Sequence, residues 1–296
     1  MSERIPNTLI DVNLDEFTGY PEEMQALDTD EAVFGAMGEA ARDFPEHLYV
    51  PRNEWKDKAA ENDELGLWAI NYTDRFTNQG KGNGGYSTHE CTTHCLRACA
   101  ESAWNRQRRI KLGPPVPRER LPVSAESASV WFSCLSIYAE ANPRQWGGAN
   151  VQQVLSIAIN RGFIPDKIQP KDWGFKHDLQ GTCGAGGVNQ SRGSWVSVRD
   201  FPDGWEETAR HFRPLECVNP RNEDQYASLL LHGYAIGIGR NGHSVPIMRM
   251  VLDNNRWYYE YPDSYDVVRY DSRAYTSGSY SIISFTAPDD WNKPAG

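Results

Sequence analysis

Residues 77–86 read TNQGKGNGGY, a glycine-rich loop ahead of a run that favours a long helix over about residues 86–108. Glycine adopts backbone conformations closed to other residues, so such a loop can turn sharply into a helix. Gln79 supplies an amide that can donate hydrogen bonds, whereas Gly85, where the helix is expected to begin, has no side chain. This turn is therefore expected to present the amide of Gln79, whereas Gly85 offers no side-chain group.

A second informative pattern lies in the last quarter of the chain. His243 follows a glycine and opens an apolar run that ends at Met250. The turn-like residues 253–255 then lead into an aromatic, strand-like run over 256–261, and Asp263 follows two positions later. Apolar and aromatic runs separated by an Asp-Asn-Asn turn predict a β-hairpin. The imidazole and the carboxylate thus stand near the outer ends of predicted strands.

Together these patterns resemble the papain-like cysteine peptidases. In that family an Asn-Gln-Gly run supplies an oxyanion-hole glutamine, and the nucleophilic cysteine follows six positions later. The resemblance implies that Gln79 holds the oxyanion position and that Gly85 stands at the nucleophile position. It also implies that His243 is the base and Asp263 the orienting group, with Tyr265 as an aromatic shield. A glycine cannot attack a carbonyl carbon, so the resemblance implies a non-catalytic member.

Other segments match the family in the same order along the chain. Residues 50–55 (VPRNEW) resemble the segment that precedes the glutamine loop, and Ser124 is expected to cap a later helix. Residues 146–150 (WGGAN) resemble the Gly-Gly turn before a short helix that runs to Arg161. The resemblance implies an α+β papain-like fold. A helical left domain and an antiparallel, β-barrel-like right domain would meet at a cleft.

Three cysteines, Cys91, Cys95 and Cys99, recur every four residues along one face of the expected helix. A metal site needs ligands that converge on one point, whereas this series spans about 12 Å along a helix axis. Cysteine is also among the most buried residue types. We therefore predict a buried core role for this face and no metal site.

Cys91 has an alternative role as nucleophile. If the helix starts near Gly85, Cys91 lies about 9 Å further along the axis, too far to share an oxyanion hole with Gln79. A later helix start, with residues 86–90 in the loop, would remove that objection. Ser87 is a poorer candidate because a hydroxyl lacks the low pKa of a thiol. The remaining alternative is an ordinary enzyme whose cysteine at position 85 was replaced by an introduced glycine.

Composition limits the function classes. The 296 residues carry a formal net charge of -10 and a pI of about 5.2, which argue against a nucleic-acid-binding surface. No apolar segment resembles a signal or approaches the roughly 18 residues of a membrane span. Without a secretory signal, the six cysteines are expected to be reduced. No cofactor motif is present.

The landmarks also predict the domain organisation. Residues 1–49 form an acidic arm or a prosegment-like region, residues 50–290 the papain-like domain, and residues 291–296 a tail. Within the domain, the left lobe is expected over about 75–165. The right lobe is expected over about 205–290 together with a crossing N-terminal strand. The right lobe should contain a capped helix over 222–231 and a first strand over 234–239.

The layout looks most like peptidase-like proteins encoded by tailed phages. That resemblance implies a virion or assembly component that acts by binding other proteins, with a peptide or chain terminus in the cleft. It places the protein in the host cytoplasm during assembly and then in the virion. The negative net charge and the lack of an apolar span argue against a nucleic-acid or membrane partner.

Overall fold

The structure is a computed structural model, and it describes the chain from Arg42 to Phe285 with gaps. The described ranges are 42–73, 91–107, 130–141, 149–168, 188–189, 194–195, 205–240, 242–263, 267–276 and 278–285. Within these ranges no helix has the length and apolar character needed to cross a bilayer.

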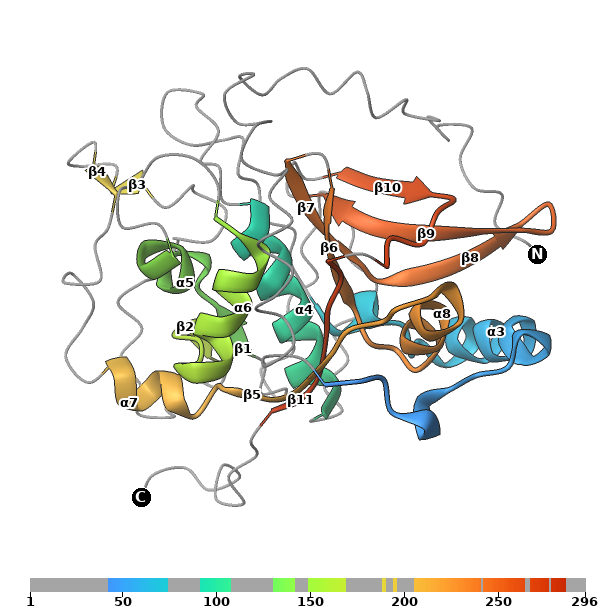
Figure 1. Ribbon diagram of the computed structural model, residues 1–296, viewed down its shortest axis with the longest axis horizontal. Coiled ribbons are helices and arrows are strands. Elements are labelled where there is room, and N and C mark those ends of the chain that lie inside the picture. The colour runs from blue at the N-terminus through green and yellow to red at the C-terminus, as the bar shows by residue number, and fades with distance from the viewer. Residues whose placement is uncertain are drawn as a thin grey trace.

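Helix α4 (Cys91–Gln107) runs through the middle of the molecule, between a mainly helical side and a side of strands accompanied by α3 (Trp55–Leu65) and α8 (Glu223–Leu231) (Figure 1). The helical side consists of α5 (Cys134–Ala141), α6 (Val151–Asn160) and α7 (Trp205–Arg210). Two short antiparallel pairings are formed by β1 (Val130–Phe132) with β2 (Pro165–Ile168), and by β3 (Val188–Asn189) with β4 (Ser194–Trp195). This two-sided arrangement confirms the predicted α+β class.

The strand side is built from antiparallel pairs. β6 (Ile236–Arg240) pairs with β7 (His243–Ile247), and β9 (Arg256–Asp263) lies between β8 (Arg249–Asp253) and β10 (Val267–Asp271). β5 (Pro214–Val218) pairs with β11 (Ser281–Phe285), and an antiparallel bridge from Gly237 to Tyr280 joins this pair to β6. The antiparallel character of this lobe is therefore as predicted.

Local side chains account for the ends of several elements. Asn150 caps α6, since its side-chain oxygen accepts from the backbone N–H of Gln152 at 2.8 Å. Asn222 caps α8 (Glu223–Leu231) in the same way, through the N–H of Gln225 at 3.0 Å. Asn254 and Asn255 both have positive φ, as a two-residue hairpin turn between β8 and β9 requires. The capped helix predicted over 222–231 and the predicted turn are confirmed, whereas the cap predicted at Ser124 lies outside the described residues.

Burial surrounds α4 on all sides. Every residue from Cys91 to Asn105 is buried, so the polar side chains of this helix need partners inside the protein. Glu101 accepts from Arg97 on the same helix and from the backbone N–H of Phe132 in β1, the latter at 2.8 Å. The carboxylate thus joins α4 to the helical side of the molecule.

An aromatic cluster fixes the lower half of α4. The Trp104 ring lies 5.0 Å from Phe212 and 5.4 Å from Phe285, measured between ring centroids, and Phe132 packs against the same three rings. Edge-on and tilted contacts of this kind add to the burial of apolar area. Because these rings come from α4, β1, the loop before β5 and β11, the cluster joins segments far apart in sequence.

Residues 205–212 contact the helical side of the molecule. α7 and Phe212, which the sequence analysis assigned to the right lobe, pack on the helical side. Gly162 has a φ of 98°, and a Cβ there would lie 1.8 Å from the carbonyl oxygen of Ala209. The close backbone approach that glycine permits brings α7 against the end of α6. The lobe boundary near residue 205 stays a prediction.

The N-terminal boundary also differs from the prediction. Arg42 exchanges backbone hydrogen bonds with Cys217 and Asn219 beside β5, and Leu48 is buried. Residues 42–49, which were assigned to the arm, therefore belong to the folded body. The short 3-10 helices η3 (Glu46–Leu48) and η4 (Arg52–Glu54) lead from there into α3 (Trp55–Leu65), and η5 (Ala69–Tyr72) follows it.

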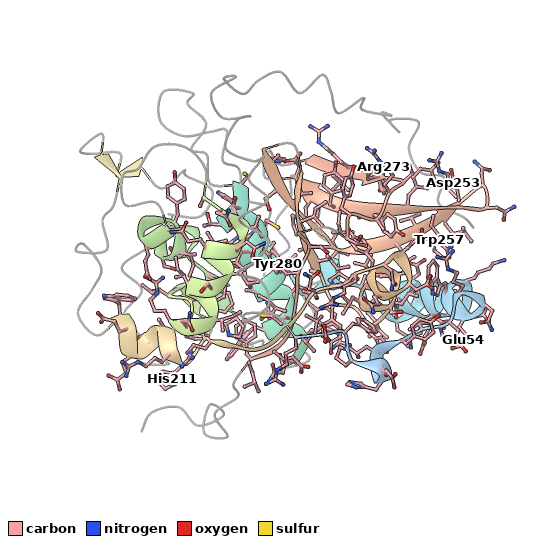
Figure 2. The ribbon with its side chains drawn as sticks, in the orientation of Figure 1. Glu54, His211, Asp253, Trp257, Arg273 and Tyr280 are labelled. Carbon is pink, nitrogen blue, oxygen red and sulfur yellow. The ribbon has the colours of Figure 1, made fainter. Side chains whose placement is uncertain are left out.

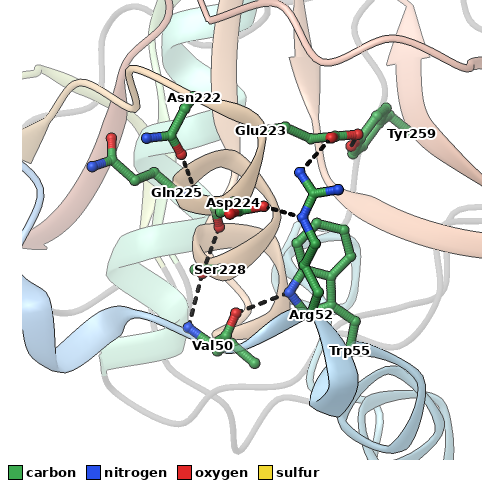
Figure 3. Close-up of polar contacts among 9 residues, drawn as sticks. All are labelled: Val50, Arg52, Trp55, Asn222, Glu223, Asp224, Gln225, Ser228 and Tyr259. Carbon is green, nitrogen blue, oxygen red and sulfur yellow. Dashed lines mark hydrogen bonds and ion pairs between the residues drawn. The ribbon is translucent and has the colours of Figure 1, made fainter.

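This leading segment is fastened to α8 (Figure 3). The buried N–H of Val50 donates to Ser228 Oγ at 2.9 Å, and that hydroxyl donates to the carbonyl of Asp224 at 2.6 Å. Arg52 pairs with Glu223 and Asp224 at the surface, where its side chain is 60% exposed. The two contacts differ in their exposure to water, and hence in their expected contribution to stability.

We expect Ser228→Ala to lower the free energy of unfolding by about 1–3 kcal/mol, because it leaves a buried N–H without its acceptor. Arg52→Ala should have a much smaller effect, since water replaces an exposed ion pair. Urea denaturation of both variants tests this ranking. A larger loss from Arg52→Ala than from Ser228→Ala would contradict it.

Candidate active site

His243 stands at the first position of β7, directly after a turn. Gly242 has a φ of 69°, which favours glycine, and His243 pairs in register with Arg240 across the hairpin. The side chain of His243 is 14% exposed. A strand start next to a tight turn therefore holds the imidazole in a fixed, largely desolvated position.

Asp263 is the last residue of β9 and lies beside this imidazole. The Nε2 atom of His243 is 3.0 Å from Oδ1 of Asp263, whose side chain is 4% exposed. A carboxylate at this distance accepts the Nε2 proton and fixes the orientation of the ring. The predicted pairing of His243 with Asp263 is present in the structure.

Cys91, the first residue of α4, approaches the same imidazole. Its thiol lies close enough to the ring to raise the pKa of His243. Because Nε2 faces Asp263, Nδ1 is the ring nitrogen left for the sulfur. Thr92, the next residue of α4, donates to the carbonyl of Ala149 at 2.8 Å and so ties this end of the helix to the start of α6. The structure thus brings a thiol, an imidazole and a carboxylate together.

The groups around His243 favour a protonated imidazole. Burial alone would lower the pKa of His243, but the hydrogen bonds to Asp263 and Cys91 and the negative charges of both groups raise it to about 10. Near neutral pH the ring therefore carries a proton while it faces the thiol. An imidazolium next to a cysteine stabilises the thiolate, which is the reactive form of the group.

The structure separates the predicted site residues into two groups. Cys91, His243 and Asp263 come together, whereas Gln79, Gly85 and Tyr265 lie outside the described residues. The objection to Cys91 assumed that α4 starts near Gly85 and that this places the thiol too far away. Cys91 lies next to His243, whereas its distance to Gln79 lies outside the described residues, so that objection stays a prediction. The roles assigned to Gln79 and Gly85 stay predictions.

Arg269, in β10, was not predicted from the sequence. Its Nε donates to Oδ2 of Asp263 at 3.0 Å, so the orienting carboxylate has a second cationic partner. The register of β9 against β10 contains the signal, because Asp263 pairs with Val267, and Arg269 lies two positions further on the same face. Spacing from Asp263 alone does not reveal this pairing.

The other cysteines of the helix face are core residues. Cys95 and Cys99 are each 1% exposed, and the Tyr280 hydroxyl lies 3.7 Å from the Cys95 sulfur, in the middle of the molecule (Figure 2). Gly237 makes room for this ring, since a Cβ there would lie 2.3 Å from it. The predicted core role of Cys95 and Cys99 is confirmed. In the described part of the chain no cluster of acidic, histidine or cysteine side chains could hold a metal ion.

Comparisons with known proteins give the fold context. The structure is similar to a chain from a study of the mite allergens Blo t 1 and Der p 1, at 13% identity and a TM-score of 0.44, over 84% of this chain and 76% of that one. It is also similar to digestive procathepsin L 3 from the larval midgut of Tenebrio molitor, at 10% identity and a TM-score of 0.45, over 84% and 78%.

Both of these proteins are papain-like cysteine peptidases. With TM-scores below 0.5, the likeness transfers no residue role to this chain. No protein-family model matches the sequence, and no curated protein matches it. The assignment of roles at the site therefore depends on its own geometry.

The raised pKa of His243 makes stability depend on pH. The folded value of about 10 exceeds the ordinary 6.5, so protonation of His243 stabilises the fold. This contribution is complete below about pH 6.5 and disappears as the pH rises through about 10. Urea denaturation between these two pH values should show a larger loss of stability for the wild-type chain than for His243→Gln. Equal losses would contradict the raised pKa, because the other titrating groups are common to both proteins.

Proposed function

We propose that the chain is a papain-like cysteine peptidase in which Cys91 is the nucleophile, His243 the general base and acid, and Asp263 the orienting group. The observation that supports this is a His243 ring that Asp263 holds at 3.0 Å, next to a Cys91 thiol that raises the pKa of the ring. Nucleophile, base and orienting group in this order make up the minimal arrangement for acyl transfer.

The arrangement supports a complete reaction cycle. In the resting pair His243 holds the proton of Cys91, and the thiolate attacks the carbonyl carbon of the substrate, which forms a C–S bond and an oxyanion. Collapse of this intermediate breaks the C–N bond, and His243 gives its proton to the departing amine. Water then attacks the thioester and gives a proton to His243, and the step releases the carboxylic acid and regenerates the thiolate–imidazolium pair.

The position of Cys91 on α4 suits its role. The amino end of a helix carries a partial positive charge that favours an anion such as a thiolate. Burial of Cys91 and Asp263 keeps bulk water from weakening these interactions. Donors for the oxyanion would include the Gln79 amide, as the resemblance implies.

A non-catalytic binding role was the first interpretation of the sequence. It depended on Gly85 facing His243 with no thiol in reach, and the thiol of Cys91 favours the catalytic alternative. The expectations of a phage virion, of protein partners and of a chain terminus in the cleft stay predictions. A peptidase could still bind such a chain terminus as a substrate or product.

Alkylation by iodoacetamide tests the thiolate–imidazolium pair. Near neutral pH, Cys91 should react at least about tenfold faster than a free thiol, and this excess should disappear in His243→Ala. Cys217→Ser is the matched control. Burial raises the pKa of the Cys217 thiol to about 12, so its replacement should leave the fast reaction of Cys91 unchanged. Peptide mapping assigns the modified residue. If no cysteine reacts faster than a free thiol, the proposed pair is absent.

Hydrolysis of casein tests the activity itself. The wild-type chain should release peptides, Cys91→Ser should lose this activity by several orders of magnitude, and Cys217→Ser should keep it. Cleavage that persists in Cys91→Ser would assign the nucleophile elsewhere. Fast alkylation of Cys91 without hydrolysis of casein or of short peptide amides would support the binding role instead.

A further inference from the structure

The orienting carboxylate has two cationic partners, one on each oxygen. Oδ1 of Asp263 faces Nε2 of His243 at 3.0 Å, and Oδ2 accepts from Nε of Arg269 at 3.0 Å. Asp263 is 4% exposed, whereas the Arg269 side chain is 24% exposed at the edge of the site. Both oxygens are thus satisfied inside the protein, and the carboxylate is fixed in one orientation.

The register between β9 and β10 places Arg269 next to Asp263. β10 runs antiparallel to β9, with Val267 opposite Asp263 and Arg269 opposite Tyr261. Side chains two residues apart share a face, so Arg269 and Asp263 are diagonal neighbours, which a long side chain can bridge. The contact therefore belongs to the sheet itself.

The charge of Asp263 needs a partner throughout the proposed cycle. While His243 is protonated, its imidazolium balances the carboxylate. When His243 gives its proton to the departing amine, the carboxylate would remain buried beside a neutral ring, which is unfavourable. A guanidinium keeps its charge at every pH of interest, so Arg269 supplies a permanent counter-charge.

We propose that Arg269 is a positioning residue of this site, which holds Asp263 ionised and in place so that His243 can release its proton. The inference rests on the proposed function and adds to it a residue that touches neither substrate nor nucleophile. It predicts that Arg269 matters most in the step in which His243 acts as an acid.

The groups around His243 define what a titration would report. Cys91 faces the ring from α4, Asp263 from β9, and Arg269 reaches it through Asp263 from β10. Arg240 of β6 pairs with His243 through the backbone. Replacing Cys91 by serine removes one of the two groups that raise the pKa of His243 and isolates the part due to Asp263 and Arg269.

Nuclear magnetic resonance titration of the His243 ring in a Cys91→Ser chain gives the first test, and His243→Gln assigns the signal. Adding Arg269→Gln should move the titration midpoint upward by roughly one pH unit, because a nearby positive charge that disfavours the imidazolium is gone. Arg273→Gln is the matched control. It removes an equal charge from the same lobe, where Arg273 pairs with Asp271 at 3.9 Å and is 67% exposed, and should leave the midpoint unchanged.

A midpoint that stays in place or falls in Arg269→Gln would overturn the inference. Arg269→Lys keeps the charge without the fork geometry of the guanidinium. In the Cys91→Ser chain it should restore most of the midpoint measured with Arg269 present. If Arg269→Gln fails to fold, Arg269→Lys decides alone: a midpoint within about a third of a pH unit of the reference supports the role of charge, and a larger rise overturns it. This readout needs no activity, so it remains decisive if the peptidase proposal fails.

Kinetic measurements on the chain that retains Cys91 give the second test. For a peptide amide, Arg269→Gln should lower kcat/KM by about tenfold or more, since the leaving amine needs a proton from His243. For the matching p-nitrophenyl ester, whose leaving group needs no proton, kcat/KM should change by less than about threefold. Equal losses on both substrates would indicate a merely structural role and overturn the inference.

Discussion

Burial of α4 between helices and strands is the constraint on which the rest of the structure depends. The helix is enclosed along its length, so its polar side chains must find partners inside the protein. Glu101 joins it to β1, and Trp104 joins it to β11 and to the segment before β5. These contacts fix the helix along its axis, and with it the position of the thiol at its first residue.

The site combines groups from elements that the fold holds independently. Cys91 comes from α4, His243 from the turn into β7, and Asp263 from the end of β9. Because α4 packs directly against β7, the first residue of the helix lies next to the first residue of the strand. Buried neighbours then set the proton balance: burial opposes the charge of His243, and the carboxylate and the thiol favour it.

Local patterns predicted the parts of this account that local chemistry determines. The capped helix over 222–231 was recognisable, and the Asn254-Asn255 turn aligned β8 with β9, the strand that carries Asp263. The position of Cys91 was not predictable in the same way, because a glycine-rich loop does not determine where its helix begins. Arg269 escaped notice because its contact depends on the register between two strands, and sequence spacing leaves that register open.

Trapping an acyl intermediate would test most directly whether Cys91 is the nucleophile. A rapid acid quench after mixing the chain with a peptide p-nitrophenyl ester, followed by peptide mass spectrometry, locates the attached acyl group. We expect a thioester on the peptide that contains Cys91, and none on the peptides that contain Cys134, Cys183 or Cys217. An acyl group on another residue, or none under conditions where the ester is consumed, would contradict the account.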